Sequence, residues 1–72
     1  MILRYNYKND RYGILEHGLW IDEGLHCGEC INVYINGKWV KDTIEYDHKI
    51  KNWYLVNSGL VGEQLEWLKV KR

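Results

Sequence analysis

The sequence feature that most constrains the fold is an Asn-Gly pair, Asn36-Gly37, which interrupts two runs of alternating apolar residues in INVYINGKWV. An Asn-Gly pair readily takes the positive φ angles of a two-residue type I′ turn, and such a turn joins two antiparallel strands. The length of the loop also fixes how the strands pair. The predicted cross-strand pairs are Ile35 with Lys38, Tyr34 with Trp39, and Val33 with Val40.

This register assigns each hairpin residue to one of two faces, because directly opposed residues share a face of the sheet. The face predicted to point toward a core carries Ile31, Val33, Val40 and Ile44. The other face carries an aromatic pair and its polar neighbours, which are Tyr34, Trp39, Asn32, Lys41 and Thr43. We therefore expect an aromatic surface on the outer side of the hairpin.

Turn signals recur roughly every 8–12 residues along the rest of the chain, which is typical of a small β domain. Further short strands are predicted at residues 2–6, 11–15, 53–56 and 68–72, and residues 19–21 are expected to extend a sheet after the break at residues 16–18. One helical or 3-10 turn is predicted within residues 62–67 near the C-terminus. Gly13 predicts a bulge or a close approach of two backbones. The pattern favours an all-β fold, a single domain over residues 1–72 built as a small antiparallel SH3-like barrel of five to six short strands, with an OB-type barrel as the alternative.

The length and charge of the chain limit the classes of function. Seventy-two residues are too few to enclose an active-site cavity of the usual size, so we expect that the protein is not an enzyme. Ten acidic and ten basic residues give zero net charge, which argues against broad, charge-driven binding to nucleic acid. No apolar run approaches the roughly 20 residues of a membrane span, and the first residues lack the layout of a signal peptide. We expect no membrane association and a cytoplasmic location.

The Cys27-x-x-Cys30 spacing is that of one half of a zinc site, which His17 and His26 could complete. A strong zinc signal needs a second pair of ligands at matching spacing, but the three histidines are scattered along the chain. We therefore interpret the cysteines as part of a tight turn that leads into a strand, with Gly28 in an open conformation. No cofactor is expected, and a structural zinc or thiol-active protein is kept as an alternative.

Binding is the function that the pattern favours. An aromatic strip beside basic side chains is typical of a site for a protein or peptide, and the candidate residues are Tyr34, Trp39, Lys41, Trp53 and Tyr54. The alternative is a nucleic-acid-binding accessory protein, and its candidate residues are Lys69, Lys71 and Arg72. We interpret the chain as a non-catalytic interaction module for a protein or peptide, either a monomer or a weak homodimer that pairs through an edge strand.

Several motifs occur together in one order along most of the chain: LHCGEC at residues 25–30, NGKWV at 36–40, WYLV at 53–56 and LKV at 68–70. With these motifs the chain resembles a short family, a domain of unknown function, from Gram-positive bacteria, their phages and their conjugative elements. The chain departs from the family at Lys41-Asp42-Thr43, where a proline and an arginine are expected, and at Trp67, where a smaller residue is expected. The resemblance implies a small all-β, intracellular bacterial protein associated with mobile DNA, and it assigns no activity or site residue.

Overall fold

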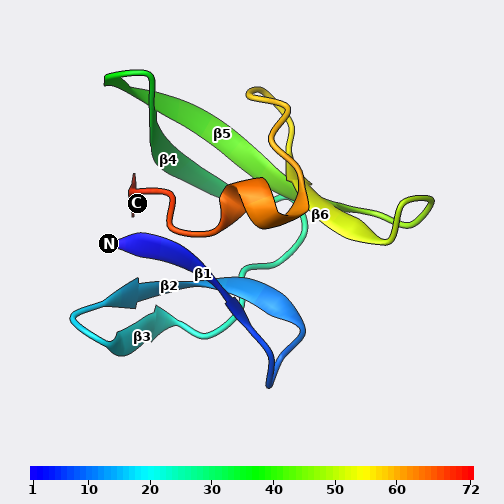
Figure 1. Cartoon of the computed structure of the whole chain (residues 1–72), viewed down its shortest axis with the longest axis horizontal. Helices are drawn as coiled ribbons and strands as arrows, with labels where there is room; N and C mark the ends of the chain where they lie inside the picture. The colour runs from blue at the N-terminus through cyan, green and yellow to red at the C-terminus, as the bar shows by residue number, and fades with distance from the viewer.

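The computed structural model describes all residues, 1–72, and it contains seven β-strands and one 3-10 turn (Figure 1). The elements are, in order, β1 (Ile2–Asn6), β2 (Arg11–Glu16), β3 (Leu19–Asp22), β4 (Cys30–Ile35), β5 (Lys38–Asp47), β6 (Asn52–Leu55), η1 (Gly62–Leu65) and β7 (Val70–Lys71). The predicted all-β fold and the predicted 3-10 turn are confirmed, with more strands than the five to six expected. No helix has the length and apolar character that crossing a bilayer requires.

The strands form two antiparallel sheets, one of order β1-β2-β3 and one of order β6-β5-β4-β7. The sheets meet on one side, where the N–H of Leu3 donates to the carbonyl of Leu68 at 2.8 Å and the N–H of Val70 donates to that of Met1 at 2.9 Å. Figure 1 shows the two chain ends side by side at this junction. The outer strands β3 and β6 do not pair with each other, so the sheets curl around a core without forming the closed barrel that the sequence favoured.

The central hairpin has the predicted register. Tyr34 lies opposite Trp39 and Val33 lies opposite Val40. At the turn, Asn36 has a φ of 51° and Gly37 a φ of 81°, which is the left-handed pair that a type I′ turn requires. The local chemistry of these two residues therefore suffices to set the strand pairing.

Eleven buried apolar side chains form the core between the sheets, and they are Leu3, Tyr12, Ile14, Leu25, Ile31, Val33, Ile44, Trp53, Leu55, Leu65 and Val70. The predicted inward direction of Ile31, Val33 and Ile44 is thus confirmed, and Val40 packs partly buried against the same cluster. Each side of the core comes from the alternate residues of a strand, as in a sheet with one buried face.

Two further residues shape the fold. Gly13 packs closely against β3, since a Cβ atom there would meet the backbone carbonyl of Asp22 and lie 2.9 Å from the ring of Trp20. The pairing of β2 with β3 also shifts register between Ile14 and Leu15, directly after this close approach, as a β-bulge does. Asp42, in the middle of β5, is 1% exposed, and its carboxylate accepts hydrogen bonds from the backbone N–H groups of Thr43, Asn57 and Ser58. This buried carboxylate fastens the loop after β6 to β5.

Candidate functional site

The aromatic pair predicted for the hairpin lies on the outer face of its sheet. Tyr34 and Trp39 are each 39% exposed, and their ring centroids lie 5.2 Å apart with the planes at 69°. The edge of one ring meets the face of the other, which is a favourable aromatic contact. The pair therefore presents partly exposed rings to solvent near the turn of the hairpin.

The segment that ends in β7 brings two lysines, Lys69 and Lys71, onto these rings. Lys71 lies opposite Asn32 of β4, and the N–H of Tyr34 donates to the carbonyl of Lys69 at 2.9 Å. The ammonium nitrogen of Lys71 lies 4.3 Å from the ring centroid of Trp39, and that of Lys69 lies 5.4 Å from the centroid of Tyr34. Both distances are within the range of cation–π interactions. The structure thus joins residues that the sequence assigned to two separate binding sites.

A third aromatic–cation contact continues the row across β1. The guanidinium carbon of Arg4 lies 3.8 Å from the ring centroid of Trp67, whose side chain is 65% exposed. Ile2 lies opposite Lys69, and Arg4 is two residues further along β1, on the same side of that strand. Trp67 has a φ of 70°, a conformation that bulky residues rarely adopt and that is retained where the surrounding structure enforces it.

We call this surface the aromatic–cation strip, and its residues are Arg4, Tyr34, Trp39, Trp67, Lys69 and Lys71. Arg4 and Trp67 were not among the residues predicted from the sequence. One signal was available for Trp67, because it precedes Lys69 and Lys71 by two and four positions in an alternating segment.

The strip carries an excess of positive charge, although the molecule as a whole is neutral. Lys69, Lys71 and the neighbouring Lys41 take part in none of the ion pairs of the structure, whereas Arg4 pairs with Glu66 at 3.3 Å. Lys41 lies opposite Asn32 and so faces outward with the strip. These exposed lysines leave the strip open to a negatively charged partner.

Three of the predicted binding residues lie elsewhere. Trp53 pairs with Tyr46 on the inner face of the sheet and is only 6% exposed, so its assignment to an exposed aromatic surface is wrong. The period of two in WYLV is compatible with either face, and packing with the core selects the inner one. Tyr54 is half-buried opposite Glu45, on the outer face of the sheet but at the other end of β5 from Trp39. Arg72 forms ion pairs with Asp22 and Glu29.

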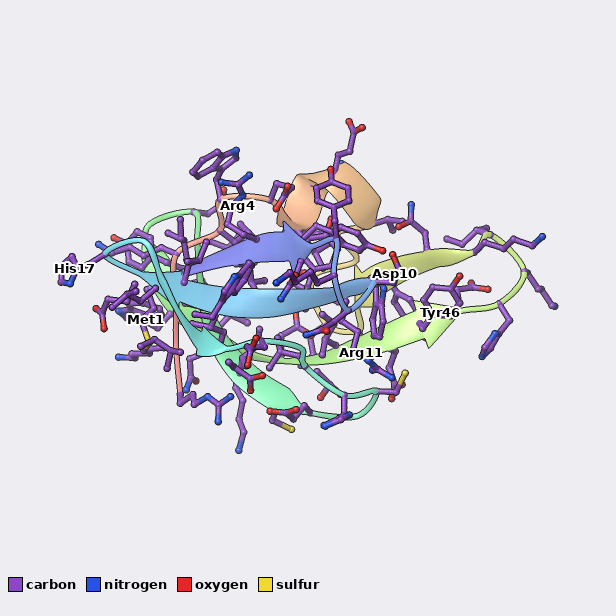
Figure 2. All side chains as sticks on the ribbon, turned by 90° about the horizontal axis from the view of Figure 1, so that it is seen from below. Met1, Arg4, Asp10, Arg11, His17 and Tyr46 are labelled. Carbon is purple, nitrogen blue, oxygen red and sulfur yellow. The ribbon has the colours of Figure 1, made fainter.

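Three of the predicted zinc ligands, His26, Cys27 and Cys30, lie in one short segment, and His17 lies apart from them in the turn between β2 and β3. Cys27 and Cys30 are exposed free thiols, and the sulfur of Cys30 lies 3.6 Å from the hydroxyl of Thr43. His17 lies at one end of the molecule and is well separated from Arg11, which lines the same pocket as Cys27 (Figure 2). No group of three or more His, Cys, Asp or Glu side chains is placed to hold a metal ion. Zinc binding through these residues stays a prediction.

Comparison with known proteins yields one kind of match. A protein-family model described as "Domain of unknown function (DUF5348)" matches residues 1–71. No curated protein and no solved structure matches the chain. The match spans both sheets and every residue of the aromatic–cation strip.

Proposed function

The chain belongs to the DUF5348 family, whose function is unknown, and we propose that it is a non-catalytic module that binds single-stranded nucleic acid along the aromatic–cation strip. The observation that carries the proposal is the row of three ring–cation contacts, at 3.8, 5.4 and 4.3 Å, on one exposed surface. Proteins that bind single strands combine positive charge along the backbone of the strand with aromatic rings on which bases stack. We propose the setting that the sequence resemblance implies, mobile DNA in a bacterial cytoplasm.

The zero net charge of the chain sets the strength of this binding. A neutral protein lacks the long-range attraction that gives basic proteins high affinity for any nucleic acid. Only the cations of the strip contribute, so we expect weak binding that depends on local contacts. Each phosphate that a cation neutralises contributes a slope of about −0.7 to the change of log affinity with log salt concentration.

The test is fluorescence anisotropy of a labelled single-stranded oligothymidylate, titrated with protein at several salt concentrations. Replacing Lys69 and Lys71 together by Gln removes two phosphate contacts, so the salt slope should become shallower by about 1.4. The matched control replaces Lys8 and Lys49, two exposed lysines outside the strip, by Gln and should leave the slope unchanged. Equal effects of the two double variants, or no binding at low salt, would refute the proposal.

A second pair of variants tests the contribution of the aromatic rings to the binding affinity. Trp39→Ala should weaken binding by about 1–3 kcal/mol, the usual loss when one base loses its stacking partner. Tyr7→Ala is the control, because Tyr7 is 80% exposed and lies outside the strip. If both variants lose the same affinity, base stacking on Trp39 is not the source of binding.

A second candidate function is binding of a protein or peptide by the same strip, as the sequence analysis expected. The observation that favours it is the exposure of Trp39, Tyr34 and Trp67, since Trp and Tyr are enriched among the residues that dominate protein interfaces. The dependence of affinity on salt concentration distinguishes the two functions. A peptide contact based on rings predicts an affinity that Trp39→Ala abolishes and that salt changes little, whereas nucleic-acid binding weakens steeply as salt rises.

A further inference from the structure

A second candidate site lies at the end of the molecule where the two sheets remain apart. An open pocket of about 600 Å³ is lined there by residues of the β1–β2 turn, the loop before β4, and the hairpin that joins β5 to β6. Figure 2 shows Asp10, Arg11 and Tyr46 close together at this end. The volume falls within the range of roughly 300–1,000 Å³ that small-molecule sites occupy, and the mouth between curled sheets is a usual place for them.

The pocket has rigid aromatic walls. The ring of Tyr5 lies 5.2 Å from that of buried Tyr12, and the ring of Tyr46 lies 5.1 Å from that of buried Trp53. The hydroxyl of Tyr12 donates to the carbonyl of Gly62 at 2.8 Å. Both phenols are neutral near pH 7, and burial, which raises the pKa of Tyr5 and raises that of Tyr12 to about 12, keeps them neutral in alkaline solution as well. Walls fixed in this way lower the entropy cost of binding a flat ring.

The charged groups of the pocket favour an anion. The guanidinium carbon of Arg11 lies 5.6 Å from the ring centroid of Trp53, and its Nη1 donates to the carbonyl of Leu25 at 3.2 Å. Lys51 supplies a second cation, while the single carboxylate, Asp10, already accepts a hydrogen bond from the hydroxyl of Tyr5 at 3.3 Å. Because Arg11 lies over the indole ring, it occupies the position that a cationic ligand would need.

We propose that this pocket binds a small aromatic anion of the size of a nucleoside monophosphate, with its ring against Tyr5 and Tyr46 and its phosphate at Arg11 and Lys51. The planar guanidinium matches the geometry of a phosphate, and the lysine adds a point charge. The site contains no residue of the aromatic–cation strip, so it stands or falls independently of the proposed function.

The reactivity of the Cys27 thiol measures whether the pocket holds a ligand, because this thiol is exposed and lines the pocket. In a Cys30→Ser background it is the only thiol, and its alkylation by N-ethylmaleimide can be followed by mass spectrometry. AMP or UMP should slow this alkylation, while adenosine and inorganic phosphate, which supply only the ring or only the charge, should each protect less. In the reciprocal Cys27→Ser background, AMP should leave the alkylation of Cys30 unchanged. Absence of protection by both AMP and UMP would overturn the proposal.

Substitution of the charged residues of the pocket tests where the phosphate of the ligand binds. Lys51→Gln and Arg11→Gln should each weaken AMP binding about tenfold, the usual loss when a charge-assisted hydrogen bond is removed. Lys49→Gln is the matched control, since Lys49 lies in the same hairpin and does not line the pocket. A thermal melt shows whether Arg11→Gln is folded. If that variant is unstable, Lys51→Gln still tests the site, because Lys51 lies in an exposed turn. The Lys69→Gln, Lys71→Gln double variant should bind AMP normally, and equal losses in Lys49→Gln and Lys51→Gln would overturn the proposal.

Discussion

Replacing Asp42 by Ala should cause the largest loss of stability among the substitutions of polar residues. The carboxylate of Asp42 is 1% exposed and accepts backbone hydrogen bonds of 2.8 Å from Thr43, 2.7 Å from Asn57 and 3.0 Å from Ser58. Alanine would leave these N–H groups without their acceptor and release the loop after β6. The substitution should therefore destabilise the whole loop between β6 and η1 and not only the site of the side chain.

The expected magnitude follows from the three hydrogen bonds. A buried donor without a partner costs about 1–3 kcal/mol, and water can still reach part of this loop, so we take the lower half of that range for each of the two loop amides. The result is a destabilisation of about 2–4 kcal/mol. A domain of this size has a total free energy of unfolding of about 4–11 kcal/mol, and the melting temperature should fall by about 10–30 °C.

The assay is denaturant unfolding followed by tryptophan fluorescence. Asp42→Asn should lose less than Asp42→Ala, because an amide oxygen can keep the bonds to Thr43 and Asn57 while only the bond from Ser58 is lost. Asp47→Ala is the control, since Asp47 also accepts backbone N–H bonds, but in an exposed turn, and should cost less than about 1 kcal/mol. A free energy of unfolding for Asp42→Ala within about 0.5 kcal/mol of that of the unmodified protein, or equal losses in the two alanine variants, would refute this role of Asp42.

Three further predictions concern backbone geometry and pH. Gly13→Ala should destabilise by about 1–3 kcal/mol in a thermal melt, because a Cβ would lie 2.9 Å from the ring of Trp20. Gly37→Ala should cost roughly 1–2 kcal/mol by the same measurement, since an alanine must then adopt a φ of 81°. Burial raises the pKa of Tyr12 from 10.0 to about 12. The folded state therefore holds this proton after the unfolded chain has released it, stability should fall as pH rises from 10 to 12, and Tyr12→Phe should flatten that dependence.

The parts of the fold that sequence patterns predict are those with a local cause. The register of the hairpin follows from Asn36 and Gly37 alone, and the outward aromatic pair follows from the register. The aromatic–cation strip depends instead on β7 lying beside both β4 and β1, which no local pattern specifies. The burial of Asp42 could not be predicted from its side chain, which is charged and is usually exposed. Its hydrogen-bond donors are backbone amides of a loop 15 and 16 residues further along the chain.

The junction between the sheets has a consequence for how the chain is made. β1 is synthesised before the segment 66–70, yet one of its edges bonds with residues of that segment, and β4 likewise pairs on one side with β7. Consecutive strands form most of the pairs in both sheets, but the junction between the sheets requires contacts between distant parts of the chain, which form more slowly than local hairpins. Until the closing segment leaves the ribosome, both strand edges stay unpaired and open to other nascent chains. The segment that places lysines on the aromatic rings thus also covers the two open strand edges, and its synthesis ends the period in which these edges can pair with other chains.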